Sequence, residues 1–309
     1  MSDFRFGVQL KGVTSGRLIR QCVERAEALG YDTVTLPDHL DAQWSPLSTL
    51  GFLAGLSKTM SFGSLVMNND LRHPVLVARE AATIAEFSGG RFELGLGAGW
   101  LSSDYHTLGL TMDPPPVRVR RLSEALMIIT QLFEGEEVTH VGEFYTVNGA
   151  TLGVAGAPQT RPKMVIGGGG RQVLGLAAHY GDVIGVNPKL SAGTPLGVSP
   201  EELSFESFQS KVRHVAESLG RHGRSAELQC RTVLVRVGPS AVAEVGDLAL
   251  AFGLGLEDVA SMPPILFGEP EKIVDDLVER RERLGLSYWI VHEDELEMFA
   301  PVVAILRGR

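Results

Sequence analysis

The stretch that decides the fold is Asp32-Thr33-Val34-Thr35-Leu36-Pro37-Asp38-His39. Its first five residues form a β-type run, which Pro37 ends because proline has no backbone N–H to give to a neighbouring strand. Asp38 and His39 therefore follow the C-terminal end of a predicted strand. Other strand-like runs also end in polar residues or glycines, so the connections between strands decide whether these ends meet at one site.

Strand-like runs alternate with helical patterns along the whole chain. They begin near residues 4, 32, 62, 92, 164, 182, 228 and 288. This alternation implies parallel strands joined by helical crossovers. A doubly wound open sheet is the alternative, but the even rhythm up to the C-terminal end favours closure. We predict a single (β/α)8 TIM barrel domain over residues 1–309, in the α/β class.

Two insertions interrupt the predicted barrel, at about residues 101–162 and 187–203. Residues 138–152 have the pattern of an antiparallel excursion, with turn signals at Gly142 and Asn148-Gly149. Residues 187–199 form a loop rich in Gly, Pro and Ser that is too long for a plain connection, so we expect a lid there. The apolar run from Leu228 to Val237 is expected to be one continuous strand.

Composition excludes several classes of protein. The chain has 309 residues, 44% of them apolar and 21% charged, with a formal net charge of −9. This acidic balance argues against a nucleic-acid partner, which demands clustered Lys and Arg. There is no membrane-length apolar run and no signal-peptide pattern. The two cysteines, Cys22 and Cys230, lack metal-ligand spacing. We expect a cytoplasmic protein without membrane, nucleic-acid or metal partners.

In a (β/α)8 barrel the active site lies at the C-terminal ends of the strands. The residues expected there are Gln9, Asp38, His39, Gly97 to Trp100, Gly167 to Arg171, Val186, Asn187, His292, Glu293 and the residues 66–69. His39 is the best acid–base group, because an imidazole titrates near neutrality. The alternative is that Asp38 caps a turn and His39 is merely exposed. His292 has the same positional claim and is held in reserve.

Two glycine clusters belong to this rim. Gly167 to Gly170 and Arg171 precede a helix, whose free N–H groups and dipole favour a phosphate. The alternative is a tight turn, which needs fewer glycines, and the segment matches neither a P-loop nor a GxGxxG motif. Gly95, Gly97 and Gly99 alternate along a strand end. They indicate either a flat ring lying against that face or dense packing of barrel side-chain layers.

Other charged residues near the rim have structural interpretations. His73 precedes Pro74 and is expected to order a helix start. Arg118, Arg120 and Arg121 fall in the first turns of a predicted helix. Such a run is typical of a solvated helix face, and the alternative is a contact with an acidic cofactor tail.

Several segments occur together in an order and spacing that is specific, although each alone is weak. They are Phe6-Gly7-Val8-Gln9-Leu10, Leu36-Pro37-Asp38-His39, Leu71-Arg72-His73-Pro74, Gly95-Leu96-Gly97-Ala98-Gly99-Trp100, Glu143-Phe144-Tyr145-Thr146-Val147, Ile166-Gly167-Gly168-Gly169 and Arg280-Arg281-Glu282-Arg283-Leu284-Gly285-Leu286-Ser287-Tyr288. With them the chain resembles the luciferase-like monooxygenase family, and within it the deazaflavin-dependent (coenzyme F420) branch. The resemblance covers nearly the whole chain.

The resemblance implies a bacterial luciferase-like barrel with coenzyme F420, or alternatively FMN, at the C-terminal rim. It implies that His39 assists hydride transfer and that Asp38 contacts the polar edge of the cofactor. It places a bulge with a non-prolyl cis peptide at Leu65-Val66, followed by Met67, behind the ring. The remaining cofactor-binding residues that it implies are Gly97, Ala98, Gly99, Ser103, Gly168, Gly169, Gly170 and Arg171.

One departure from the family pattern concerns the cofactor tail. Many relatives carry Asn or Glu shortly after the Gly-Trp pair, whereas this chain continues Leu101-Ser102-Ser103-Asp104. The tail contacts there stay open. Substrate contacts are expected near Trp44 and in residues 104–116 and 187–199.

The resulting hypothesis is a homodimeric, F420-dependent oxidoreductase that moves a hydride between the deazaflavin and a small organic substrate. The alternatives are an FMN-dependent monooxygenase that uses dioxygen, and a non-catalytic flavin-binding or deazaflavin-binding barrel.

Overall fold

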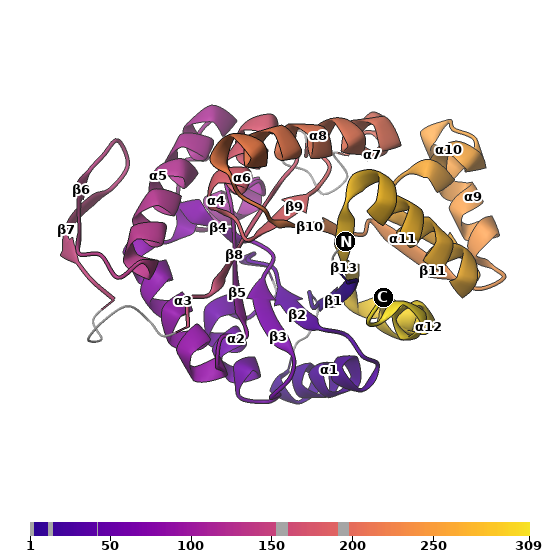
Figure 1. Cartoon of the computed structure of the whole chain (residues 1–309), viewed down its shortest axis with the longest axis horizontal. Coiled ribbons are helices and arrows are strands. Elements are labelled where there is room, and N and C mark those ends of the chain that lie inside the picture. Colours follow the sequence, from indigo (N-terminus) through magenta and orange to yellow (C-terminus); the bar gives the residue numbers. More distant parts are fainter. Residues whose placement is uncertain (1–2, 12–14, 42, 153–159, 191–197) are drawn as a thin grey trace.

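The eight predicted runs are eight parallel strands. The computed structural model describes residues 3–11, 15–41, 43–152, 160–190 and 198–309 (Figure 1). The strands are β1 (Arg5–Gln9), β2 (Thr33–Leu36), β3 (Ser61–Ser64), β5 (Phe92–Gly97), β8 (Lys163–Gly168), β9 (Val183–Val186), β10 (Glu227–Arg231) and β13 (Leu286–His292).

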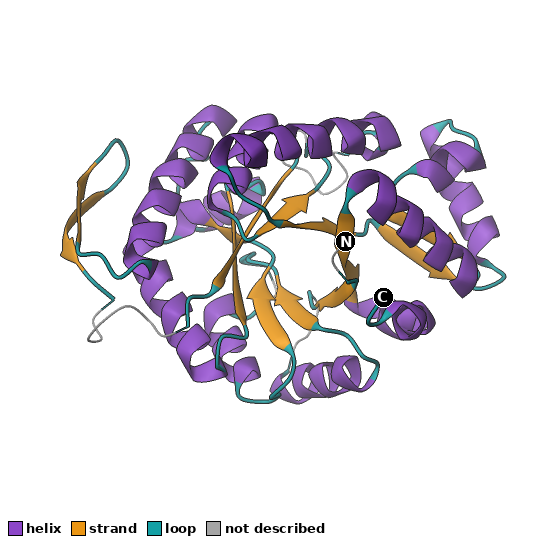
Figure 2. Ribbon diagram, in the orientation of Figure 1, coloured by secondary structure: helices purple, strands orange, loops and turns teal. Residues whose placement is uncertain are grey.

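These strands close on themselves. Their order is β3-β2-β1-β13-β10-β9-β8-β5, and β3 also pairs with β5. Every pairing between them is parallel, as in the registers of β1 with β13 and of β5 with β8. Figure 2 shows the strands at the centre with helices around them. The predicted (β/α)8 TIM barrel is confirmed.

The outer layer consists of helices whose apolar stripes face the strands. They are α1 (Gly16–Ala28), α2 (Pro46–Ala54), α3 (Pro74–Ser88), α5 (Pro115–Phe133), α6 (Arg171–Tyr180), α8 (Phe205–His222), α11 (Pro270–Leu284) and α12 (Leu296–Leu306). His73 caps α3 by accepting a hydrogen bond from the backbone N–H of Val75, so its predicted role at a helix start is confirmed. None of the described helices is long and apolar enough to cross a membrane.

Side chains alternate between the helix layer and the barrel interior. In β13, Trp289 and Val291 join the core under the helices, whereas Tyr288 and Ile290 join the cluster inside the barrel. Below that cluster Arg5 forms ion pairs of 2.5 Å with both Glu93 and Glu227. This polar layer closes the barrel interior toward its N-terminal end, and in this fold the active site lies at the C-terminal mouth.

The excursions predicted within residues 101–162 are present. Helix α4 (Ser102–Thr107) precedes α5, and β6 (Val138–Val141) pairs antiparallel with β7 (Thr146–Ala150). Of the predicted lid, residues 191–197 lie outside the described residues. The described part of this second insertion ends in the short helix α7 (Pro200–Leu203).

The prediction of one strand from Leu228 to Val237 is wrong. The strand β10 ends at Arg231, after which the N–H of Val233 donates to the carbonyl of Pro264. The segment β11 (Leu234–Val237) then pairs with β12 (Ile265–Gly268), which the sequence analysis missed. Together with α9 (Ala241–Phe252) and α10 (Leu256–Ser261) they enclose a second apolar cluster beside the barrel. Only Thr232 and Val233 separate β10 from β11, and neither is a proline or a glycine, so no local signal marks the break.

We predict that Gly95→Ala destabilises the barrel strongly. A Cβ atom at this position would lie 1.8 Å from the backbone oxygen of Ser64, which belongs to a strand and cannot move aside easily. The free energy of unfolding should fall by about 3 kcal/mol, as for an overpacked core site, in a urea titration. The matched control is Gly220→Ala in α8, where nothing lies within 4 Å and stability should rise by about 0.5–1 kcal/mol. Equal effects at the two glycines would contradict the packing argument.

Candidate functional site

The strand β3 continues into a bulge that enters the barrel mouth. The Leu65–Val66 peptide bond is cis, as the family resemblance implies. The Val66 side chain lies against the glycines of the neighbouring strands. A Cβ atom would come within 3.1 Å of Val66 at Gly95, within 2.7 Å at Gly97 and within 3.5 Å at Gly167. Of the two readings of the alternating glycines, close packing explains Gly95 and Gly97. A ring at the mouth would therefore rest on Val66.

The bulge is also held by β1, which is separated from β3 only by β2. The side-chain amide of Gln9, at the end of β1, donates a 2.8 Å hydrogen bond to the carbonyl of Leu65. Leu65 itself belongs to the buried cluster inside the barrel. The surface that Val66 offers to the mouth is thus fixed by contacts on both sides.

His39 lies at the mouth in a defined orientation. Its Nδ1 atom is 2.9 Å from Oδ2 of Asp104, and its side chain is 20% exposed. The other oxygen of Asp104 accepts a 3.0 Å hydrogen bond from the backbone N–H of Leu40. The Trp100 ring stands edge-on to the imidazole, at 89° and a centroid distance of 5.5 Å. Because the carboxylate accepts, Nδ1 carries the proton and Nε2 keeps its lone pair.

Asp104 is the functional residue that the sequence analysis did not assign. It is 2% exposed and lies on α4, immediately after the fourth barrel strand. The signal in the sequence is an acid four residues after Trp100, which the sequence analysis treats only as a departure in the cofactor-tail region. The contact with His39 spans 65 residues of sequence, so spacing alone does not reveal it.

Asp38 has its carboxylate occupied within the protein. Its oxygens accept hydrogen bonds of 2.6 and 2.9 Å from Arg72, and one of them also accepts from the backbone N–H of Asn68. The residue is 2% exposed. The turn that contains His39 is thus attached, through these contacts, to the segment that follows the bulge. A cofactor contact at Asp38 would therefore run through its backbone or through Arg72.

The other residues assigned to the cofactor differ in accessibility. Met67, in the short strand β4 (Met67–Asn68), is 1% exposed and packs in the core under the helices. Only its backbone can face a ligand. Ser103 is exposed in the first turn of α4. Gly99 has φ of +72°, and a Cβ atom there would lie 2.3 Å from the Tyr105 hydroxyl, so only glycine fits.

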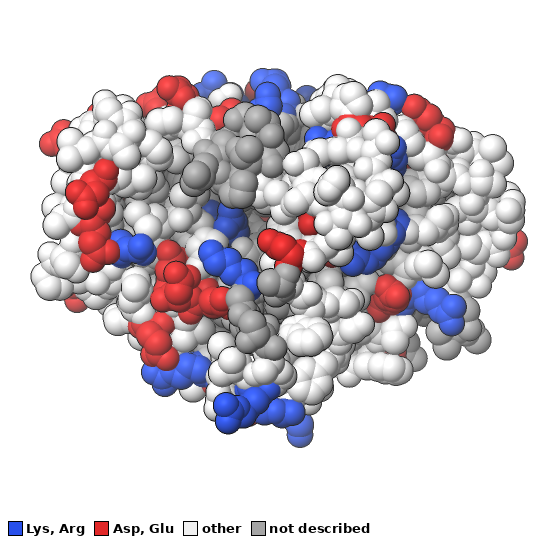
Figure 3. Space-filling model, turned by 180° about the vertical axis from the view of Figure 1, so that it is seen from behind, with Lys and Arg blue, Asp and Glu red and all other residues white. Residues whose placement is uncertain are grey.

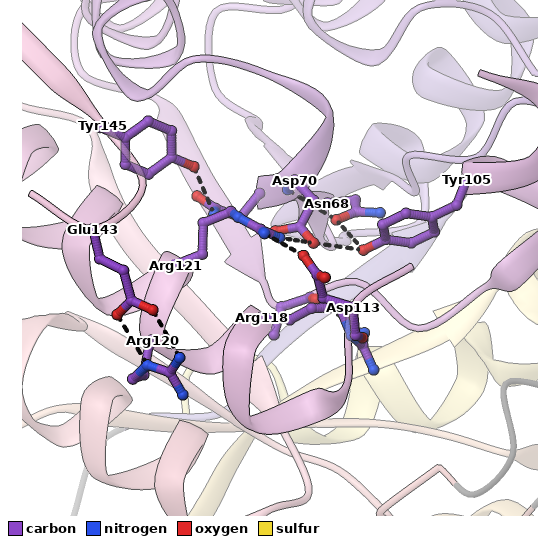
Figure 4. Close-up of polar contacts among 11 residues, drawn as sticks. Asn68, Asp70, Tyr105, Asp113, Arg118, Arg120, Arg121, Glu143 and Tyr145 are labelled. Atoms are coloured by element: carbon purple, nitrogen blue, oxygen red, sulfur yellow. Dashed lines mark hydrogen bonds and ion pairs between the residues drawn. The ribbon is translucent and has the colours of Figure 1, made fainter. Parts of the chain in front are cut away.

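The basic start of α5 braces the mouth instead of facing solvent. Arg118 is buried and donates to the carbonyls of Ala98 and Gly99. Arg121 pairs with Asp70 at 2.7 Å and also with Asp113 (Figure 4). The prediction of a solvated helix face is therefore wrong for these two residues, and the alternative, a contact with an acidic cofactor tail, stays a prediction. Arg120 alone is exposed, in an ion pair of 2.8 Å with Glu143.

The second glycine cluster combines packing with an open helix start. The segment after β9 covers Gly169 so closely that a Cβ atom would lie 2.4 Å from the backbone nitrogen of Lys189. Gly170 is the N-cap of α6, has no side-chain cap and has no atom within 4 Å of a Cβ position. The guanidinium of Arg171 faces His214 of α8, with 3.3 Å between the nitrogens. The backbone N–H groups in the first turn of α6 receive no side-chain cap from Gly170, which fits the expected anion.

His292 stands across the barrel from the bulge, as the last residue of β13. Its Nε2 atom is 3.1 Å from a guanidinium nitrogen of Arg231, the last residue of β10. Burial, together with the charges of Arg231 and Lys11, lowers the pKa of His292 to about 4. The imidazole is therefore neutral at pH 7, and Nε2 accepts from Arg231 because a guanidinium can only donate.

We predict that His292 stays neutral throughout the physiological range. The pKa in the folded protein lies below the ordinary value of 6.5, so the unfolded chain takes up the proton first as the pH falls. The contribution of His292 to stability is fully present above pH 6.5 and is lost between pH 6.5 and pH 4. An NMR titration of its imidazole resonances should show a midpoint near 4, and a midpoint above 6 would contradict this environment.

Comparisons with known proteins agree with this geometry. Residues 3–241 match the model of a family described as luciferase-like monooxygenase. The chain is 35% identical over 183 residues to the 5,10-methylenetetrahydromethanopterin reductase of Archaeoglobus fulgidus, covering 59% of this chain and 53% of the relative. It is 34% identical over 165 residues to the F420-dependent glucose-6-phosphate dehydrogenase of Microbacterium testaceum, covering 51% and 48%. The chain thus spans about half the length of these curated relatives.

Solved structures share the fold over the full length. The structure of an F420-dependent secondary alcohol dehydrogenase in complex with an F420-acetone adduct superposes with a TM-score of 0.77. The superposition covers 99% of this chain and 100% of that one, at 18% sequence identity. The family model itself matches more than three quarters of the chain, from β1 into α9. The chain belongs to the luciferase-like monooxygenase family.

Proposed function

We propose that the protein is an F420-dependent oxidoreductase that transfers a hydride between the deazaflavin and a small organic substrate. The observation that supports it best is the His39–Asp104 pair at the mouth, beside Trp100 and beyond the bulge of Val66. A proton carrier with a fixed tautomer, set beside a flat apolar support, is what such a reaction asks of a protein. The similarity to the F420-dependent glucose-6-phosphate dehydrogenase of Microbacterium testaceum supports the same cofactor.

The residues at the mouth fit a deazaflavin. Val66, filling the space above three glycines, offers an apolar platform for the ring. The backbone of residues 97–99 and the exposed Ser103 lie on the path proposed for the tail. The open N-terminus of α6 at Gly170 provides free N–H groups for a phosphate, with Arg171 adjoining it. These assignments are proposals that depend on the cofactor.

When bound, the deazaflavin would supply or accept the hydride at its central ring carbon. The chain contributes the position of the partners and the proton. Holding a substrate over a ring that rests on Val66 removes most of the entropic barrier to the transfer. His39 would take up or release the accompanying proton at Nε2, while Asp104 holds the orientation of the imidazole through Nδ1.

Two rivals share the fold. In the first, reduced FMN and dioxygen replace the deazaflavin, in keeping with the family's description as monooxygenases. In the second, the barrel binds a flavin or deazaflavin without turning over. A homodimer and a cytoplasmic location, both implied at the level of the sequence, stay predictions.

The cofactor assignment predicts selective binding. Titration of the purified protein with oxidised F420, reduced F420 and FMN, followed by protein fluorescence, should show saturable binding of the deazaflavin and weaker binding of FMN. Tight binding of FMN, together with no change in protein fluorescence on addition of F420, would contradict the cofactor proposal. A screen of enones, imines, alcohols and aldehydes, followed by the absorbance of bound F420, separates an enzyme from a simple binder. Oxidation or reduction of F420 that depends on one of these compounds indicates an enzyme.

The proton role predicts a specific pattern of variants. His39→Ala should keep the F420 dissociation constant and lower turnover by about 10²- to 10⁴-fold, the usual contribution of a general acid or base. Asp104→Asn should also spare cofactor binding and should cause a smaller loss, since the imidazole stays but loses its anionic partner. His106→Ala is the matched control, because His106 is an exposed histidine on the same helix as Asp104. Unchanged turnover in His39→Ala would move the role to His292.

A further inference from the structure

The wall of the mouth opposite the bulge ends in a cation without a carboxylate partner. Arg231 closes β10, and the alternation of that strand turns it inward with Gln229 and Glu227, while Cys230 packs in the outer core. Within the described residues, its one side-chain hydrogen bond goes to His292, and none of the ion pairs there includes it. Burial lowers the pKa of Arg231 below its ordinary value, which reflects this lack of compensation.

The neighbours of Arg231 orient it without neutralising it. His292 is uncharged and accepts one N–H, so it fixes the plane of the guanidinium and leaves the other donors unused. Glu295, in the short helix η2 (Glu293–Glu295), is the buried acid whose charge acts on Arg231, but it forms no ion pair with Arg231 among the described residues, and its oxygens accept from the backbone N–H groups of His292 and Val235. Lys11 adds a further positive charge near His292.

The position of Arg231 in the barrel places it across the mouth from the bulge, where a substrate would lie. In the closed order of eight strands, β10 lies directly across from β3, which carries the bulge, and β13 lies across from β5. A ring that rests on Val66 therefore presents its free face toward Arg231 and His292. Figure 3 views the molecule from the side opposite to Figure 1 and shows both basic and acidic side chains around the centre of that face.

From this geometry we propose that Arg231, held by His292, binds an anionic oxygen group of the substrate, so that the substrate class is small organic carboxylates or phosphate monoesters. The inference rests on the proposed function, because it takes the mouth to be the substrate site. A guanidinium with unused parallel donors matches either oxyanion in a bidentate arrangement. Arg231 is half-buried, so a partly desolvated guanidinium would gain a charged partner from the incoming anion that the described residues do not supply.

The test uses three probes of similar size: benzoate, phenyl phosphate and benzamide. Binding is measured by calorimetry at fixed ionic strength, on the protein alone and on the protein saturated with F420. At least one anion should bind about 10- to 100-fold more tightly than benzamide, as expected of a hydrogen bond to a charged group. The anion with the lower dissociation constant shows whether the site prefers a carboxylate or a phosphate.

Variants assign the preference to one side chain. Arg231→Gln should reduce the preference for the anion to less than about twofold while the F420 dissociation constant is unchanged, and Arg231→Lys should retain part of it. The control is Arg236→Gln, which removes a guanidinium paired at 2.7 Å with Glu244 in the small sheet outside the barrel. That control should keep the full preference.

The outcomes separate the two proposals. Equal binding of anions and benzamide by the unaltered protein, or an anion preference that survives Arg231→Gln, would overturn the anion site and leave the cofactor proposal standing. Loss of F420 affinity in Arg231→Gln without any change in anion binding would assign the guanidinium to the cofactor, and this result would also overturn the anion site. If F420 does not bind at all, the proposed function fails, while the measurements on the protein alone still decide the anion site.

Discussion

The close contact between β3 and β5 is the constraint on which the barrel and its mouth both depend. These strands close the barrel, and Gly63 and Gly95 allow their backbones to meet, with the backbone oxygen of Ser64 1.8 Å from a Cβ position at Gly95. The hydroxyl of Ser64 then donates to the carbonyl of Gly95 and accepts from its N–H, each at 2.9 Å. The Ser64 side chain thus replaces the backbone hydrogen bonds between β3 and β5 at the point where β3 continues into the bulge. The bulge in turn directs Val66 into the mouth.

The two walls of the mouth differ in chemistry. One wall, formed by the bulge and the glycines beneath it, is apolar and close-packed, which suits a flat ring. The other ends in Arg231 and His292, which are polar and only partly satisfied by the protein. His39 follows β2, the strand next to the one that carries the bulge, and its Nδ1 atom is held by Asp104. A ring on one wall and a charged group on the other would place a small molecule between them, within reach of one imidazole.

Much of the surrounding polar structure supports these few groups. The Asp38–Arg72 pair fixes the turn before His39, and Arg118 holds the carbonyls of Ala98 and Gly99 ahead of Trp100. Arg121 ties the start of α5 to the segment after the bulge through Asp70. Each of these charged side chains is buried or half-buried and is bonded to other groups of the protein, so each contributes by fixing the geometry of the mouth.

The sequence by itself determined the eight strands, the helices between them, the rim position of His39 and, through the family resemblance, the bulge at Leu65–Val66. These follow from local patterns: apolar periodicity, proline and glycine at the ends of runs, and motifs in order. The tertiary structure alone decided that Asp104 belongs to His39, that Arg118 and Arg121 brace the mouth, and that β10 stops at Arg231. The reason is physical: such contacts join residues tens of positions apart, and an ion pair or a strand break leaves no period in the sequence.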